Sequence, residues 1–294
     1  EKDADSTIYP ASMTKMMTAL LAIEANPDLD TPVTLPEEIF PALQAQNASL
    51  AGFQAGETAT VRDLLYGAML PSGAECCEAL ARQVSGSEEA FVALMNRKAG
   101  ELGMKHTHFA NCTGLTSPEH YSSAADLAVL LQAALNNETF RTVFTTGQYT
   151  SSVTAQHPKG LYMASTLLSR LDGGEVTGGQ ILGGKTGYTR AAGYCLVSSA
   201  ERNGVRILSV AMGCDGPLNA DIEACYNFVD SRTLYDWAFD NFSYRSILSS
   251  TEPITKVNVE MAEGDGTVML YPAGNLNVLM QNEVSNDAIE REVT

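Results

Sequence analysis

Ser12 and Lys15, in the tetrapeptide SMTK, are residues whose types and spacing suit covalent chemistry. A separation of three places both side chains on one face of the helix predicted for residues 12–25. Their neighbours on that face, Thr18, Ala19 and Ala22, are small, so the lysine either extends to water or is buried. Burial disfavours the ammonium form and would let Lys15 act as a base at neutral pH. Free N–H groups at the helix start would favour negative charge on Ser12, so the pair predicts a serine nucleophile.

The segment GGKTGYT, residues 183–189, carries a second lysine motif at the end of a predicted strand. Its glycines would let a substrate backbone approach closely. Lys185 would supply a fixed positive charge and Thr186 a hydroxyl donor. Taken singly, each motif has a simpler interpretation: a capping serine with a solvated lysine for Ser-x-x-Lys, and an ordinary strand end for Lys-Thr-Gly. Their combination favours a catalytic site.

The segment PSGAECCEALA, residues 71–81, adds a second serine at a predicted helix start. Ser72 followed three residues later by Glu75 is typical of a capping box. A serine at a helix mouth is also a component of one class of acyl-transfer site. The two interpretations are compatible, so we expect Ser72 to cap its helix with Glu75 while its hydroxyl faces Ser12 and Lys15.

The elements that would position the first two serines are helical. The run SMTKMMTALLAIEA is apolar or small almost all round, which indicates a buried helix ended by Asn26 and Pro27. Further helices are indicated after Thr60, over residues 88–102 before Gly103, and in SSAADLAVLLQAAL with its Ser-x-x-Asp start. Residues 12–146 are therefore predicted to be largely helical.

Later segments have the pattern of a sheet. GQILGGKTGYT, GYCLVSSA and VRILSVAMG are predicted strands, and Asn203-Gly204 favours a hairpin between the last two. The next run has apolar residues at helical spacing, namely Ile222, Cys225, Tyr226, Val229, Thr233 and Trp237. We expect an α/β (α+β) fold: an antiparallel sheet flanked by helices, with a mostly helical subdomain. Residues 1–247 would form this domain, and the alternating residues 248–294 would begin a small β-rich domain.

Composition limits the partners. The net charge of −17, from 18 Lys and Arg against 35 Asp and Glu, repels nucleic acid and anionic lipid. No apolar run has the length of a membrane span, and the first ten residues are too polar for a signal peptide. If the protein is exported, we expect its signal to have been removed from this chain.

No metal or other cofactor is expected. The six cysteines lack Cys-x-x-Cys spacing and the density of a disulfide scaffold, so most are predicted to be small buried hydrophobic residues. His106 and His108 lie two apart in KHTHF without a supporting cluster of ligands, which favours a loop over a metal site.

The three serine and lysine motifs occur in the order known for penicillin-binding proteins and serine β-lactamases. The chain closely resembles one group of these, the serine D-alanyl-D-alanine carboxypeptidases, which are low-molecular-mass penicillin-binding proteins of bacterial cell walls. The resemblance covers about residues 8–245, and the tail from about 250 resembles the opening of the family's C-terminal β domain. The similar stretches include YPASMTKMMTALLAIE, GETATVRDLLYGAMLPSG, GSEEAFVALMNRKAGELGMKHTHFANCTGL, HYSSAADLA and GGKTGYTRAAGYCLVSSA.

The resemblance implies a mechanism. Ser12, deprotonated by Lys15, would attack the carbonyl between the last two D-alanines of a peptidoglycan stem peptide, and water would hydrolyse the acyl-enzyme. Ser72 would relay a proton to the leaving amine. The residues that would bind the substrate are Lys185 and Thr186, for its carboxylate, and Gly187 and Tyr188, with the N–H groups of Ser12 and Tyr188 forming the oxyanion hole. β-Lactams would acylate Ser12, and Arg190 lies at the rim or is an ordinary exposed arginine.

Three departures from the family pattern stand out. Ala74 replaces the usual asparagine of the middle motif, and one lost donor of this kind costs on the order of a hundredfold in rate. Only eleven residues precede Ser12, where the family has a helix and two strands, so we expect the chain to be a fragment or to lack its early residues. We expect contact with the membrane only through the amphipathic C-terminal helix of many members, a segment absent from this chain. The extracytoplasmic, cell-wall location is therefore an implication of the resemblance.

Two alternatives remain. A serine β-lactamase shares the three motifs, but a class A enzyme needs a glutamate for deacylation, for which we find no convincing equivalent after the middle motif. A non-catalytic wall-binding homologue could have lost activity through Ala74. The intact Ser12, Lys15, Lys185 and Thr186 argue against that loss.

Overall fold

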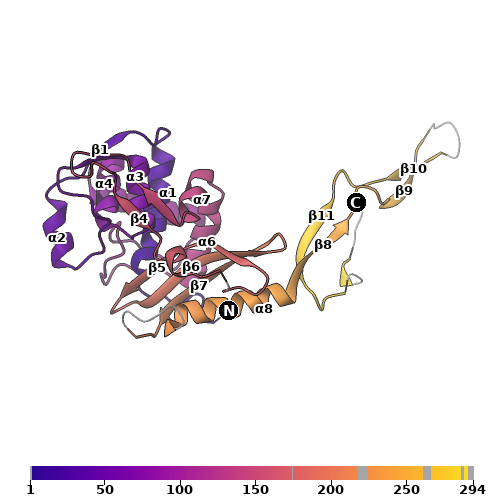
Figure 1. Cartoon of the computed structure of the whole chain (residues 1–294). Helices are drawn as coiled ribbons and strands as arrows, with labels where there is room; N and C mark the ends of the chain where they lie inside the picture. Colours follow the sequence, from indigo (N-terminus) through magenta and orange to yellow (C-terminus); the bar gives the residue numbers. More distant parts are fainter. Residues whose placement is uncertain (1, 174, 218–223, 261–265, 286–287, 291–294) are drawn as a thin grey trace. The chain divides into compact units, whose positions relative to one another are not determined.

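The computed structural model describes residues 2–173, 175–217, 224–260, 266–285 and 288–290 (Figure 1). The chain divides into two compact units, one of residues 1–201 and 206–235 and the other of residues 202–205 and 236–294. The second unit thus begins inside a helix, about a dozen residues before the boundary expected at 247. The assignment of residues 1–247 to a catalytic domain stays a prediction.

The first unit begins with the segment that carries Ser12 and Lys15. A short 3-10 helix, η1 (Ala11–Thr14), leads into α1 (Lys15–Ala25), so the predicted helix is confirmed with a tighter first turn. Lys15 to Leu20 are all buried, because α1 lies at the centre of the helical cluster (Figure 1). Around it lie α2 (Ile39–Ala45), α3 (Val61–Met69), α4 (Ala74–Ser85), α5 (Glu88–Leu102), α6 (Ala124–Leu135) and α7 (Glu138–Phe144).

Local signals explain where several of these helices begin and end. Thr60 and Asp63 form a reciprocal capping box at α3, because each side chain accepts the other residue's backbone N–H. Ser123 accepts the N–H of Asp126 at the start of α6. Gly103 ends α5 with φ of 76°, a conformation that glycine adopts without strain. These boundaries confirm the sequence predictions.

Short strand pairs and one longer sheet complete the first unit. The pairs are β1 (Pro32–Thr34) with β2 (Thr58–Thr60) and β3 (Gln148–Thr150) with β4 (Tyr162–Ala164), followed by the 3-10 helix η2 (Leu168–Arg170). The sheet has the order β5 (Gln180–Thr189), β6 (Gly193–Arg202), β7 (Val205–Cys214). Asn203 and Gly204, with φ of 53° and 79°, form the expected hairpin turn between β6 and β7.

The helix α8 (Tyr226–Asn241) begins later than the sequence pattern suggested, and Ile222 lies outside the described residues. Its first half packs on the sheet. Tyr235 is fully buried and its hydroxyl lies 2.8 Å from that of Ser198 in β6. Ser209 of β7 donates a hydrogen bond to Ser231 at 3.2 Å. The sheet is therefore covered by α8 over this length.

The second unit is rich in strands, as expected from the alternation after residue 248. β8 (Phe242–Leu248) pairs with β11 (Leu276–Gln281), and β9 (Thr255–Asn258) pairs with β10 (Thr267–Leu270), both antiparallel. Across the described residues of both units, no helix is long and apolar enough to cross a membrane. All six cysteines are free thiols, and five of them are buried as predicted.

Candidate active site

Ser12 and Lys15 lie in direct contact. The Nζ atom of Lys15 donates a hydrogen bond to the Oγ atom of Ser12 at 2.9 Å and another to the carbonyl oxygen of Thr113 at 2.6 Å. Only 3% of Lys15 is exposed, and this burial lowers the pKa of its amine below the usual lysine value. The pair therefore combines a hydroxyl with an amine that loses its proton more readily than a solvated lysine does.

The loop that holds Lys15 is shaped by Asn111. The carboxamide oxygen of Asn111 accepts the backbone N–H groups of Thr113 and Gly114, and its nitrogen donates to the carbonyl of Leu115. This turn directs the Thr113 carbonyl toward Lys15. Gly114 has φ of 88°, and a Cβ atom there would lie 1.9 Å from the carbonyl oxygen of Ala11. Glycine is thus required for the loop to reach the Ser12 turn, which is the short helix η1 of residues 11–14.

Strand β5 approaches the same turn from another direction. A Cβ atom on Gly187 would lie 2.9 Å from the backbone nitrogen of Ser12, and 3.1 Å from the Cβ atom of Ala11. Ala11 itself has φ of 48°, a left-handed conformation that alanine adopts only at a cost. The strand and the strained turn therefore place the Lys-Thr-Gly motif beside Ser12, as the motif set predicts.

Ser72 pairs with Lys185, and the predicted capping box is wrong. The Nζ atom of Lys185 donates to the Oγ atom of Ser72 at 2.9 Å and to the Thr186 carbonyl at 2.9 Å. The N-cap of α4 is Gly73, without a side-chain cap, and Ser72 has φ of 70°. Glu75 instead accepts the N–H groups of two residues in the preceding loop, Ala51 and Gly52.

The two serine–lysine pairs influence each other electrostatically. Lys185 is completely buried, and its burial lowers the pKa of its amine well below the usual value. The positive charge of Lys15 lowers this pKa further. A proton on Lys15 therefore makes a proton on Lys185 less favourable, and Lys185 gives up its proton more readily than a solvated lysine does.

The other predicted site residues lie further along β5. The hydroxyl of Thr186 lies 2.6 Å from that of Thr166. Tyr188 is 40% exposed, and its ring packs at 4.6 Å from the ring of Tyr194 on β6. Arg190 is exposed in the turn between β5 and β6, which fits either of its two interpretations.

Ala74 is the first residue of α4 and is 1% exposed. Its backbone N–H donates to the carbonyl of Ser49 at 2.8 Å. The position that usually carries an asparagine is therefore occupied by a methyl group in a closely packed place. A side-chain amide there would need room as well as partners.

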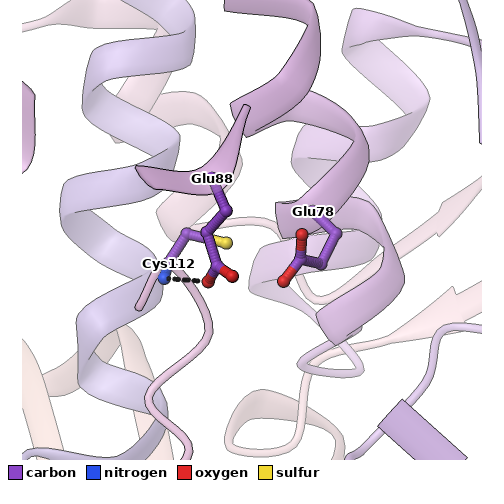
Figure 2. A group of neighbouring side chains, drawn as sticks. All are labelled: Glu78, Glu88 and Cys112. Atoms are coloured by element: carbon purple, nitrogen blue, oxygen red, sulfur yellow. Dashed lines mark hydrogen bonds between the residues drawn. The ribbon is translucent and has the colours of Figure 1, made fainter. Parts of the chain in front are cut away.

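A further cluster of ionisable groups includes Cys112, the residue before Thr113 (Figure 2). Within the described part of the chain, Glu78, Glu88 and Cys112 form the group of three potential metal ligands, with ligand atoms within 4.8 Å of one another. Glu88 accepts the backbone N–H of Cys112 at 3.0 Å. Burial and the charge of Glu88 raise the pKa of Glu78 to about 7, although Arg82 lies 3.5 Å from its carboxylate. The Glu78 carboxyl is thus disposed to keep its proton, and no sequence spacing suggested the cluster.

Residues 1–216 match the family described as D-alanyl-D-alanine carboxypeptidase. The chain belongs to this family of serine peptidases. The D-alanyl-D-alanine carboxypeptidase DacF of Bacillus subtilis is 35% identical over 99% of this chain and 71% of its own length. The D-alanyl-D-alanine carboxypeptidase of Streptomyces strain K15 is 34% identical over 72% of this chain and 74% of its own.

Solved structures agree with the family assignment. The crystal structure of the Streptomyces K15 DD-transpeptidase has a TM-score of 0.66 and 32% identity, covering 80% of this chain and 90% of that one. Penicillin-binding protein 5 from Haemophilus influenzae has a TM-score of 0.74 and 26% identity, covering 96% of this chain and 78% of that one. The mixed helix and sheet fold expected for a D-alanyl-D-alanine carboxypeptidase is confirmed.

Some residues that hold the site of this carboxypeptidase together carry no sequence motif. The carbonyl of Thr113 gives no sequence signal, although the Asn-x-x-Gly spacing of Asn111 and Gly114 is typical of a turn. Thr166, which contacts Thr186, lies in a segment without a motif. His120, whose ring contacts the Ser12 turn, was also missed.

Proposed function

We propose that this protein removes the terminal D-alanine from peptidoglycan stem peptides through an acyl-enzyme on Ser12, and that β-lactams acylate the same serine. The observation that carries the proposal is the 2.9 Å contact between Ser12 and the buried Lys15. A serine hydroxyl is a weak nucleophile until a neighbouring base takes its proton. The lowered pKa of Lys15 makes the neutral amine available for that task.

In the acylation step, the Oγ atom of Ser12 forms a bond to the carbonyl carbon between the last two D-alanines as its proton passes to Lys15. The bond from that carbon to the amide nitrogen then breaks. The leaving nitrogen needs a proton, and the hydrogen-bonded pair of Lys185 and Ser72 is suited to deliver it. Water attacks the resulting ester and regenerates Ser12.

The substrate carboxylate would be held near β5. The negative charge of the substrate carboxylate would favour the protonated form of the fully buried Lys185, and Thr186 provides a hydroxyl donor. Gly187 keeps the strand close to the nitrogen of Ser12, so the N–H groups of Ser12 and Tyr188 would receive the oxyanion. The family resemblance and the close approach of Gly187 to Ser12 both support this oxyanion hole.

The substrate and the inhibitors place the proposed activity outside the cytoplasmic membrane, at the cell wall. Peptidoglycan strands whose stem peptides end in D-Ala-D-Ala are built into the wall there. The acidic composition argues against a nucleic-acid partner.

The test is covalent labelling with a fluorescent penicillin, together with D-alanine release from diacetyl-lysyl-D-alanyl-D-alanine. We expect one label per chain and measurable release, both lost in Ser12→Ala and both kept in Ser6→Ala, an exposed serine of the same segment. An unlabelled parent protein would favour the non-catalytic homologue. Turnover of the chromogenic cephalosporin nitrocefin far above D-alanine release would favour a β-lactamase.

The likeness to a DD-transpeptidase supports a second reaction of the same acyl-enzyme. An amine acceptor would replace water in the second step and form a new peptide bond. Adding a glycyl acceptor to the release assay distinguishes the two, because transpeptidation yields a longer peptide while hydrolysis yields only the shortened acid.

A further inference from the structure

His120 lies in the loop between α5 and α6 and is 1% exposed. The backbone on either side of it is fixed by pairing with distant segments. Tyr121 exchanges backbone hydrogen bonds with His108 at 2.9 and 3.0 Å, and Ser122 exchanges two with Ile8 at 2.9 Å. The second pair joins this loop to the segment that leads into the Ser12 turn. The ring of His120 is therefore held in a defined place beside that turn.

The hydrogen bonds of the His120 ring define its tautomer. Its Nδ1 atom accepts the backbone N–H of Ala110 at 2.9 Å, so this nitrogen carries no proton. The other ring nitrogen, Nε2, lies 2.7 Å from the Oγ1 atom of Thr14 and must be the N–H donor in the neutral ring. Burial, with smaller contributions from His108 and Lys15, lowers the pKa of His120 to about 4. The ring is thus neutral, with both nitrogens used.

The acceptor of this bond, Thr14, stands between the two residues of the proposed catalytic pair. It closes the short helix η1 and is completely buried. The turn is under strain, since Ala11 at its start has φ of 48°. Strained backbone persists only where surrounding contacts hold it. The hydrogen bond from His120 to Thr14 is such a contact, reaching the turn from a loop 106 residues away in sequence.

We propose that His120 is a positioning residue for acylation, which holds Thr14 so that the Oγ atom of Ser12 stays within reach of Lys15. The inference rests on the proposed acylation of Ser12. A misplacement of about 1 Å in reacting groups costs on the order of a hundredfold in rate. The loss of this bond should therefore slow the acylation step far more than it weakens the initial binding of the β-lactam.

The experiment measures the acylation rate constant and the dissociation constant of the initial complex with a fluorescent penicillin. His120→Ala and Thr14→Val should each slow acylation by about ten- to a hundredfold with little change in that dissociation constant. The double variant should be no slower than the slower single one, because both changes remove one bond. His120→Gln keeps an acceptor for Ala110 and a donor for Thr14, and should return the rate to within about threefold of the parent.

His157→Ala is the matched control. His157 lies in the loop between β3 and β4, and its Nδ1 atom is 2.8 Å from the carboxylate of Glu57. This variant therefore loses a partly buried histidine that has no bond to Thr14. Its acylation rate should equal that of the parent. Thermal unfolding confirms that each variant is folded at the assay temperature. If His120→Ala does not fold, the acylation rates of Thr14→Val and His120→Gln test the inference instead.

Parent-like acylation in folded His120→Ala overturns the inference. So do an additive loss in the double variant, or a His120→Gln variant as slow as His120→Ala. In each of these cases the parent is still labelled on Ser12, and the proposed function stands. A parent protein that is not labelled at all overturns both.

Discussion

The Nζ atom of Lys185 lies 2.9 Å from the Oγ atom of Ser72, a residue 113 positions earlier in the chain. Ser72 holds its hydroxyl in place with φ of 70°, in the left-handed region that non-glycine residues avoid. The contact and the strained backbone belong together, since strain of this kind is common at functional sites. Ser72 thus gives up local stability to meet a lysine on β5.

Replacing Ser72 separates these two effects. Ser72→Ala and Ser72→Gly should each slow acylation by about a hundredfold, because both remove the hydroxyl that would pass a proton to the leaving amine. The free energy of unfolding of Ser72→Gly should be about 1 kcal/mol larger than that of Ser72→Ala, because glycine relieves the left-handed strain. Urea denaturation and penicillin labelling measure the two quantities. Equal stability of the two variants would contradict the strain argument.

Gly187→Ala should slow acylation by about a hundredfold or more, because a methyl group would press on the backbone nitrogen of Ser12. Gly147→Ala is the control, since the nearest atom to its new methyl group is 3.9 Å away on Leu168. The control should be labelled at the parent rate. If Gly187→Ala were labelled at the parent rate, the strand would have to be able to move away from the turn.

The acylation rate should depend on pH through Lys15. Burial lowers the pKa of this amine, so the neutral base appears at a lower pH than 10.5, the ordinary lysine value. The rate constant should rise with pH and reach its plateau below 10.5. Stopped-flow labelling over a range of pH values measures the profile. A rate that continues to rise through 10.5 would show that Lys15 is not buried in solution.

Glu78 should make the protein less stable as the pH rises through the range from about 4.5 to about 7. Its raised pKa means that the folded state binds more protons than the unfolded state in this range, so stability falls with increasing pH. Glu78→Gln should therefore raise the melting temperature more at pH 8 than at pH 5. The exposed Glu101→Gln serves as the control and should shift both values equally.

Ala74→Asn should increase D-alanine release by at least tenfold if the amide typical of the family acts on the substrate. The same change should cost about 1–3 kcal/mol of stability, because Ala74 is buried and the added group must be accommodated. Ala74→Leu fills a similar volume without an amide and should lose stability without gaining rate. Equal release by the parent and Ala74→Asn would mean that another group has taken over the role.

Two similar sequence patterns show how far prediction from the sequence reached. Thr60 with Asp63 and Ser72 with Glu75 both have the spacing of a capping box, yet only the first pair forms one. Asp63 has its partner within its own helix start. Ser72 instead bonds to Lys185, and Glu75 bonds to the loop before α4. The sequence around Ser72 and Glu75 gives no sign of these distant partners.

Periodicity and glycine positions were sufficient for the main helices and the β6–β7 hairpin, whereas the approach of Lys-Thr-Gly to Ser12 was predicted from the set of three motifs. The parts that could not be predicted are contacts between distant segments. Every residue has a backbone carbonyl, so the sequence cannot indicate that the carbonyl of Thr113 contacts Lys15. The histidine at 120 has no motif, because its role depends on which turn the fold brings next to it.

Gly114 and Gly187 close on the Ser12 turn from two sides, and this limits how the site can evolve under an antibiotic. A side chain at either position would collide with backbone atoms of Ala11 or Ser12. Drug resistance by added bulk at these positions would therefore displace the nucleophile that the natural substrate also needs. The exposed side chains of Tyr188 and Arg190 can change without such a collision.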